Sequence, residues 1–131
     1  MSDYLEVGGK DSDGIPVLEI DYDDNQMFRP RIAPLLAEKL VSEYRRLSTQ
    51  GPAPVCVLHI RAKVAGSPLV RAVFELYKVV SADSGTLFCA NYPVNFMESL
   101  TSLGLTALPG FRLTASTEEA LGLARREKKG H

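Results

Sequence analysis

Val55-Cys56-Val57-Leu58-His59-Ile60 is a run of six residues in which only His59 is polar. A strand with one face in solvent alternates apolar and polar side chains, whereas a strand covered by helices on both faces is apolar almost throughout. The turn-forming segment Gly51-Pro52-Ala53-Pro54 ends the preceding element directly before this run. The run therefore predicts a buried strand in a sheet that carries helices on both faces.

A helical pattern stands on each side of this strand. Before it, apolar residues recur every three or four positions over 30–49, and we expect them to face the core: Ile32, Leu35, Leu36, Leu40, Tyr44 and Leu47. After it, Ser67-Pro68 offers an N-cap followed by proline at the first helical position. A second helix is expected over 68–82, with these residues facing inward: Leu69, Val70, Val73, Phe74, Leu76, Tyr77 and Val80.

The outer segments complete an alternating pattern. Residues 5–7 and 15–22 predict two hairpinned strands around a flexible turn at 8–14. Further along we expect a strand at 87–90, a helix at 93–103, a weak strand at 111–113 and a last helix that begins near Ser116. In the 93–103 helix the residues predicted to face inward are Val94, Met97, Leu100 and Leu103. The order β-β-α-β-α-β-α-β-α predicts an α/β fold, a mixed sheet of four to five strands with helices packed on it.

Composition narrows the function classes. The 131 residues suit one domain, and 45% hydrophobic with 24% charged residues is ordinary for a globular protein. A net charge of −1 argues against a protein that coats nucleic acid or lies on an acidic membrane surface. No apolar run approaches the roughly 18 residues of a membrane span, and the first six residues do not read as a signal peptide. We expect a cytoplasmic protein, a monomer or weak homodimer, without direct membrane insertion.

Patterns for catalysis and metal binding are incomplete. Gly8-Gly9-Lys10 lacks the remainder of a phosphate-binding loop. Asp21, Asp23 and Asn25 have calcium-loop spacing, but glutamine stands where that loop needs glycine. Cys56 and Cys89 each lie in an apolar run, which predicts buried thiols. His59 is best explained as a hydrogen-bonded structural residue. The sequence predicts no enzyme, no cofactor and no metal site.

The second half of the chain carries a family resemblance. Gly85 precedes an apolar strand, Leu100-Thr101-Ser102-Leu103-Gly104-Leu105 ends a helix, and Ser116-Thr117-Glu118-Glu119-Ala120-Leu121 opens the next. This order resembles the STAS domain of anti-sigma factor antagonists and of the cytosolic tails of sulfate transporters, over about 15–124 and most specifically over 85–121. The resemblance implies a STAS-like domain at 15–124, an N-terminal strand and turn at 1–14, and a basic C-terminal tail at 125–131.

The resemblance also implies a working site before the second helix. In the family a serine in an Asp-Ser-(Ser/Thr)-Gly-Leu loop is phosphorylated by a partner kinase that doubles as the anti-sigma factor. Here the loop is Ala65-Gly66-Ser67-Pro68-Leu69. A gap-free count from the later motifs places Ser67 on the phosphorylated serine, whereas pairing Leu69 with the family leucine places Gly66 there. In both registers the aspartate is missing, and the family's Gly-Glu-Leu-Asp after the second strand is replaced by Tyr22-Asp23-Asp24-Asn25.

Two partner classes follow from the resemblance, and no nucleic acid is among them. The first is an anti-sigma factor or serine-kinase-like protein, bound through 65–69 and the outer face of the next helix at Arg71, Glu75 and Lys78. The second is a membrane transporter of which the chain is an accessory subunit, without phosphorylation. For Ser67 itself the alternative is a plain N-cap, worth about 1 kcal/mol.

Overall fold

The computed structural model describes residues 5–12, 14–22, 31–47, 54–61, 67–92 and 94–129. Within them the chain forms one sheet of five strands with four α-helices and a short 3-10 helix. The elements are β1 (Leu5–Ser12), β2 (Ile15–Tyr22), α1 (Ile32–Leu47), β3 (Val55–Ile60), α2 (Ser67–Ala82), β4 (Thr86–Ala90), α3 (Val94–Ser102), η2 (Leu105–Ala107), β5 (Phe111–Leu113) and α4 (Thr117–Lys129). This order confirms the predicted α/β alternation.

The sheet runs in chain order, β1-β2-β3-β4-β5. β1 pairs antiparallel with β2, and the four strands from β2 to β5 are parallel. β3 lies at the centre and all but His59 of its side chains are buried. The mixed sheet and the buried central strand are therefore as the sequence predicts.

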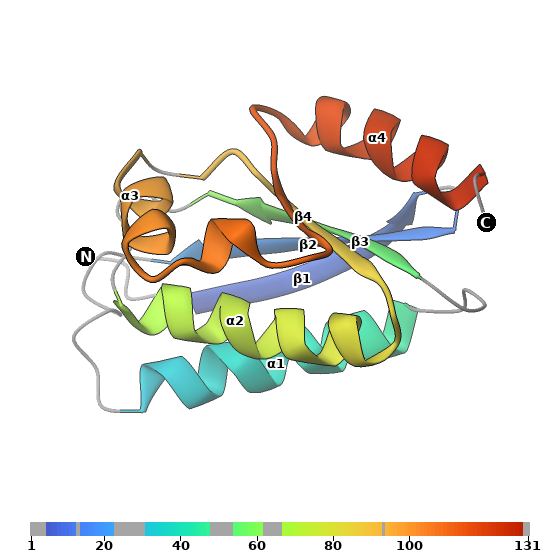
Figure 1. The fold of residues 1–131 in the computed structure, drawn as a ribbon. Coiled ribbons are helices and arrows are strands. Elements are labelled where there is room, and N and C mark those ends of the chain that lie inside the picture. The colour runs from blue at the N-terminus through green and yellow to red at the C-terminus, as the bar shows by residue number, and fades with distance from the viewer. Residues whose placement is uncertain are drawn as a thin grey trace.

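Helices cover the two faces of the sheet unequally (Figure 1). α1, α2 and α3 supply buried residues to the larger core cluster, among them Leu40, Leu76 and Phe96. α4 lies on the opposite side of the sheet, and its Ala120 and Ala124 pack with Phe88 in a second, smaller cluster. α4 contacts β2, β3 and β4. α4 therefore lies over the middle of the sheet.

The first strand differs from prediction. β1 extends to Ser12, so Gly8 to Ser12 pair with β2 and do not form a flexible turn. Gly14, directly before β2, is part of a turn and adopts a φ of 83°. The error has a physical cause: an edge strand can be held by the backbone bonds of its one neighbour, so glycine and polar residues are tolerated there.

The helices differ from prediction in their exposed residues and their ends. Leu35, Met97 and Leu103, predicted to face inward, are 42%, 47% and 66% exposed. In α3 the buried side chains include Phe96 in addition to the predicted Leu100; the side chain of Val94 lies outside the described residues. α4 runs to Lys129, so the predicted basic tail is helical as far as that residue, because basic residues suit a helix C-terminus.

Candidate functional site

The predicted partner loop leads into α2. Ala65 and Gly66 lie outside the described residues. Ser67 is the first residue of α2 and Pro68 follows half-buried, as expected for proline at a helix start. Leu69 is 0% exposed and belongs to the main core. The prediction that Leu69 contacts a partner is therefore corrected: its side chain anchors α2 to the sheet.

The three predicted contact residues of α2 are all exposed. Glu75 and Lys78 form an ion pair with an N–O distance of 2.8 Å, and Lys78 also lies 5.4 Å from the centre of the Phe74 ring. Exposed pairs of this kind contribute little to stability. Arg71 takes part in no ion pair among the residues that the structure describes. Of the three predicted contact residues, Arg71 is therefore the one whose charge is open to a partner.

A pocket of about 260 Å³ lies between α1 and α2, which pack directly against one another. Its walls are Ala33, Pro34 and Ala37 of α1 together with Arg71 and Glu75 of α2. The α1 side is made of small apolar side chains, and the α2 side carries one cation and one carboxylate. The structure thus places two of the predicted contact residues at the rim of a recess.

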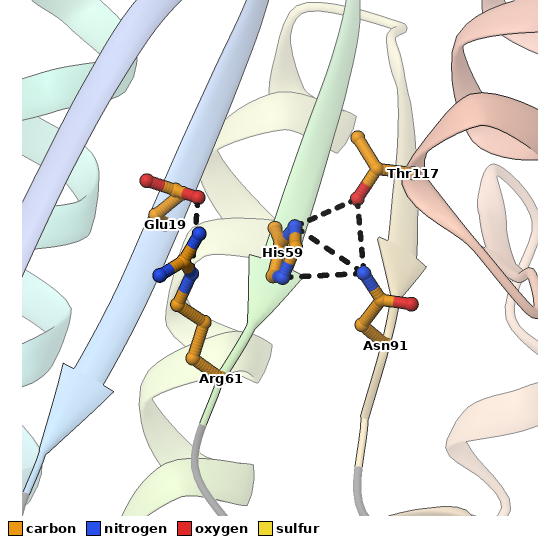
Figure 2. A network of polar contacts seen from close by, with 5 residues as sticks. All are labelled: Glu19, His59, Arg61, Asn91 and Thr117. Carbon is orange, nitrogen blue, oxygen red and sulfur yellow. Dashed lines mark hydrogen bonds and ion pairs between the residues drawn. The ribbon is translucent and has the colours of Figure 1, made fainter.

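A polar cluster lies where the parallel strands end, on the face of the sheet opposite to α1 and α2 (Figure 2). His59 of β3 lies beside Asn91, which follows β4, and Thr117, which begins α4. Thr117 Oγ1 is 2.8 Å from His59 Nδ1, and Asn91 Nδ2 is 3.2 Å from His59 Nε2. Asn91 Nδ2 also donates to Thr117 Oγ1 over 3.4 Å. The hydrogen bonds match the prediction of a structural histidine.

These partners define the state of the imidazole. An amide N–H donates, and Asn91 Nδ2 lies 3.2 Å from Nε2 and 3.4 Å from Nδ1, so an unprotonated ring nitrogen accepts from Asn91. The direction of the Thr117 hydrogen bond follows from the tautomer. Burial is the largest influence and lowers the pKa of His59, with Arg61 and Lys10 acting in the same direction and Glu19 opposing them. A neutral ring can accept from Asn91 through its unprotonated nitrogen, which an imidazolium cannot do. His59 is therefore held neutral, as a link between β3, β4 and α4.

The lowered pKa gives a pH dependence with a definite sign. The unfolded chain takes up the proton near pH 6.5, and the folded chain takes it up at lower pH. Stability is therefore greatest above about pH 6.5 and falls as the pH drops through the folded pKa. Thermal unfolding should show a steeper acid loss for the wild type than for His59→Gln. In a proton NMR titration the His59 midpoint should lie below about 6.5; a midpoint above it would contradict this assignment.

Beside this cluster, Arg61 and Glu19 form an exposed ion pair with an N–O distance of 3.3 Å. Both also line a polar recess of about 410 Å³ at the β1 end of the sheet, with Glu6, Asp21 and other residues. In the described part of the chain no group of three His, Cys, Asp or Glu side chains could hold a metal ion. Asp23 and Asn25 of the calcium-like spacing lie outside the described residues.

The two cysteines lie in the core and line neither the α1–α2 pocket nor the His59 cluster. Cys56 and Cys89 are both 0% exposed and unpaired by disulfide, and burial raises the pKa of each thiol far above its ordinary range. They are protonated core residues, as predicted. The described residues thus offer a surface for contacts in the α1–α2 pocket and a structural polar cluster at His59.

The His59 cluster was not predicted as a set. Its members come from three separate segments, and each is unremarkable in its own sequence context. The available signal was positional: residues that follow neighbouring parallel strands meet at one edge of the sheet.

Comparisons with known proteins add no relative to these observations. Among the described residues no helix is long and apolar enough to cross a membrane. No protein-family model matches the chain, and no curated protein matches it either.

Proposed function

We propose that the chain is a STAS-like protein-interaction domain that acts in bacterial partner switching. It binds an anti-sigma factor or serine-kinase-like protein at the start of α2 and does no chemistry of its own. The motif order of the second half of the chain and the α/β fold support this proposal. The observation that carries it is the α1–α2 pocket, because Arg71 and Glu75, chosen from the sequence, line it.

The size of the pocket favours a protein partner over a small molecule. Its volume of about 260 Å³ is below the roughly 300–1,000 Å³ of typical ligand sites. It can accept one apolar side chain of a partner between the α1 alanines and the α2 charges. Arg71 can then donate to a carboxylate of the same partner, since charge-assisted hydrogen bonds to arginine are strong and directional.

Phosphorylation of Ser67 would act on this contact directly. A phosphate adds roughly −1.5 to −2 charges, and Ser67 and Arg71 are four positions apart, which makes them neighbours on a helix. The first turn of α2 contains no acidic residue that would repel the phosphate. The phosphate would pair with Arg71, withdraw it from the partner's carboxylate and repel that carboxylate. One modification would thus switch the complex without refolding the domain.

Charge reversal at Arg71 tests the surface. We expect Arg71→Glu to weaken binding to a partner of the anti-sigma kinase class by at least about tenfold, or 1.4 kcal/mol, measured by calorimetry. Arg112→Glu is the matched control, because it makes the same charge change on exposed β5 at the far edge of the sheet and should bind as the wild type does.

Equal binding by Arg71→Glu and the wild type would contradict the proposed surface. Co-purification with a membrane transporter, unchanged by Ser67→Asp, would instead support the accessory-subunit function.

A further inference from the structure

Among the described residues, no further strand pairs with the outer edge of β1. β1 is the first strand in the order, and its eight residues pair with β2 only. The Gly9 carbonyl accepts a hydrogen bond from Arg46 of α1 over 3.4 Å, so it points away from β2. Backbone groups alternate in direction along a strand. Val7, Gly9 and Asp11 therefore present their N–H and C=O groups outward.

Gly8, at the middle of this edge, carries no side chain although the fold leaves room for one. A Cβ added to Gly8 would meet nothing within 4 Å, and Gly8 is absent from the glycines with positive φ. Gly9 differs, because its Cβ would meet Leu47 at 2.7 Å. Glycine inside a strand weakens it and often marks the close approach of another backbone. Side chains of a strand stand roughly perpendicular to the sheet, so the open space at Gly8 lies over a face of the sheet, and the centre of the outer strand carries no side chain.

We propose that two copies of this chain pair through β1, antiparallel, about a two-fold axis at Gly8. In this register Val7 of one copy faces Gly9 of the other, and both present outward backbone groups. The two sheets then form one continuous sheet. The inference does not depend on the proposed function, because β1 and α2 are separate surfaces.

The charges on β1 select this register among those that the backbone allows. With the axis at Gly8, Glu6 of each copy stands opposite Lys10 of the other, and symmetry repeats the pair. Within one chain Glu6 stands opposite Asp21, and like charges directly opposite one another are unfavourable. Lys10 of the second copy would offset this repulsion. Moving the axis by one residue to Gly9 would place Glu6 opposite Ser12 and lose both pairs.

The side of α1 next to β1 fits the same arrangement; we call its residues Leu35, Lys39, Glu43 and Arg46 the α1 stripe. Lys39 lines the recess along β1 together with Glu6, Val7 and Gly8, and Glu43 and Arg46 form an ion pair beside Gly9. Leu35 precedes Lys39 by four positions, on the same side of the helix, and is 42% exposed. The two-fold axis brings the two α1 helices side by side, because they lie on the same face of the joined sheet. The α1 stripe would supply paired charges and one leucine to the contact between the two copies.

Charge swaps test the pairing. Sedimentation of the full chain should show a monomer–dimer equilibrium. Lys10→Glu should weaken the dimer by at least about tenfold, since two attractive pairs become repulsive. Glu6→Lys should act in the same way, and the double variant Glu6→Lys/Lys10→Glu should restore the wild-type dissociation constant. Arg112→Glu, with the same charge change at the other edge, should dimerise normally.

Thermal unfolding of each variant separates lost pairing from lost folding, because β1 charges lie on an exposed face and should leave the fold intact. A monomer at all concentrations up to about 1 mM would overturn the proposal. A dimer that both single swaps leave unchanged, or that the double swap does not restore, would overturn it as well.

Discussion

Phe88→Ala is expected to lower the free energy of unfolding by about 3–5 kcal/mol, the range for removing a fully buried aromatic ring. Phe88 is 0% exposed on the face of β4 that meets α4. The buried α4 residues in that cluster are Ala120 and Ala124. Alanines cannot extend to fill the space left by a ring, so the cavity would remain and α4 would lose its contact with the ring.

Urea unfolding measures this loss. Leu123→Ala is the matched control, because Leu123 is on the same helix but 37% exposed, and its truncation should cost less than about 1 kcal/mol. Detachment of α4 would also remove Thr117 from His59. In Phe88→Ala the pKa of His59 should therefore move back toward its ordinary value. A loss below about 1 kcal/mol would show that α4 is held by other contacts.

Gly85→Ala is expected to be the second large loss, about 1–3 kcal/mol or more, through overpacking. A Cβ at Gly85 would lie 2.4 Å from the Pro54 carbonyl oxygen, which accepts the Thr86 N–H. Because the obstacle is backbone at the start of β3, no rotamer change relieves it. The start of the β3–β4 pair would have to separate.

Gly122→Ala provides the control for this substitution. Gly122 lies inside α4, and a Cβ there would meet nothing within 4 Å. Alanine favours a helix over glycine by about 0.8–1.0 kcal/mol, so this variant should be more stable than the wild type. Opposite signs for the two variants are the expected result, measured by chemical denaturation. A Gly85→Ala protein as stable as the wild type would contradict the close packing of β3 and β4.

The predictable part of the fold was the part governed by burial. The apolar run at 55–60 identified the central strand, and the periodicity of Leu36, Leu40 and Tyr44 identified α1. β1 was only partly predictable, because an edge strand held by backbone pairing needs no apolar pattern. Leu35 was assigned to the core because periodicity alone does not give the width of the buried stripe.

The candidate site was likewise predictable from the sequence only in part. Arg71 and Glu75 could be chosen from the sequence, because a helix of known phase separates inward from outward positions. The pocket that they line with Ala33 and Ala37 depends on how α1 and α2 pack, which no local pattern encodes. The contact of His59 with Thr117 links positions 58 residues apart, and only the sheet order brings them together.

Treatment of the chain with a serine kinase of the anti-sigma class and ATP tests the proposed switch most directly. Mass spectrometry should locate one phosphate on Ser67, and the Ser67→Ala variant should receive none. The phosphorylated chain should bind the same kinase at least about tenfold more weakly in calorimetry. Absence of phosphate from Ser67, together with absence of binding by the unmodified chain, would contradict the account.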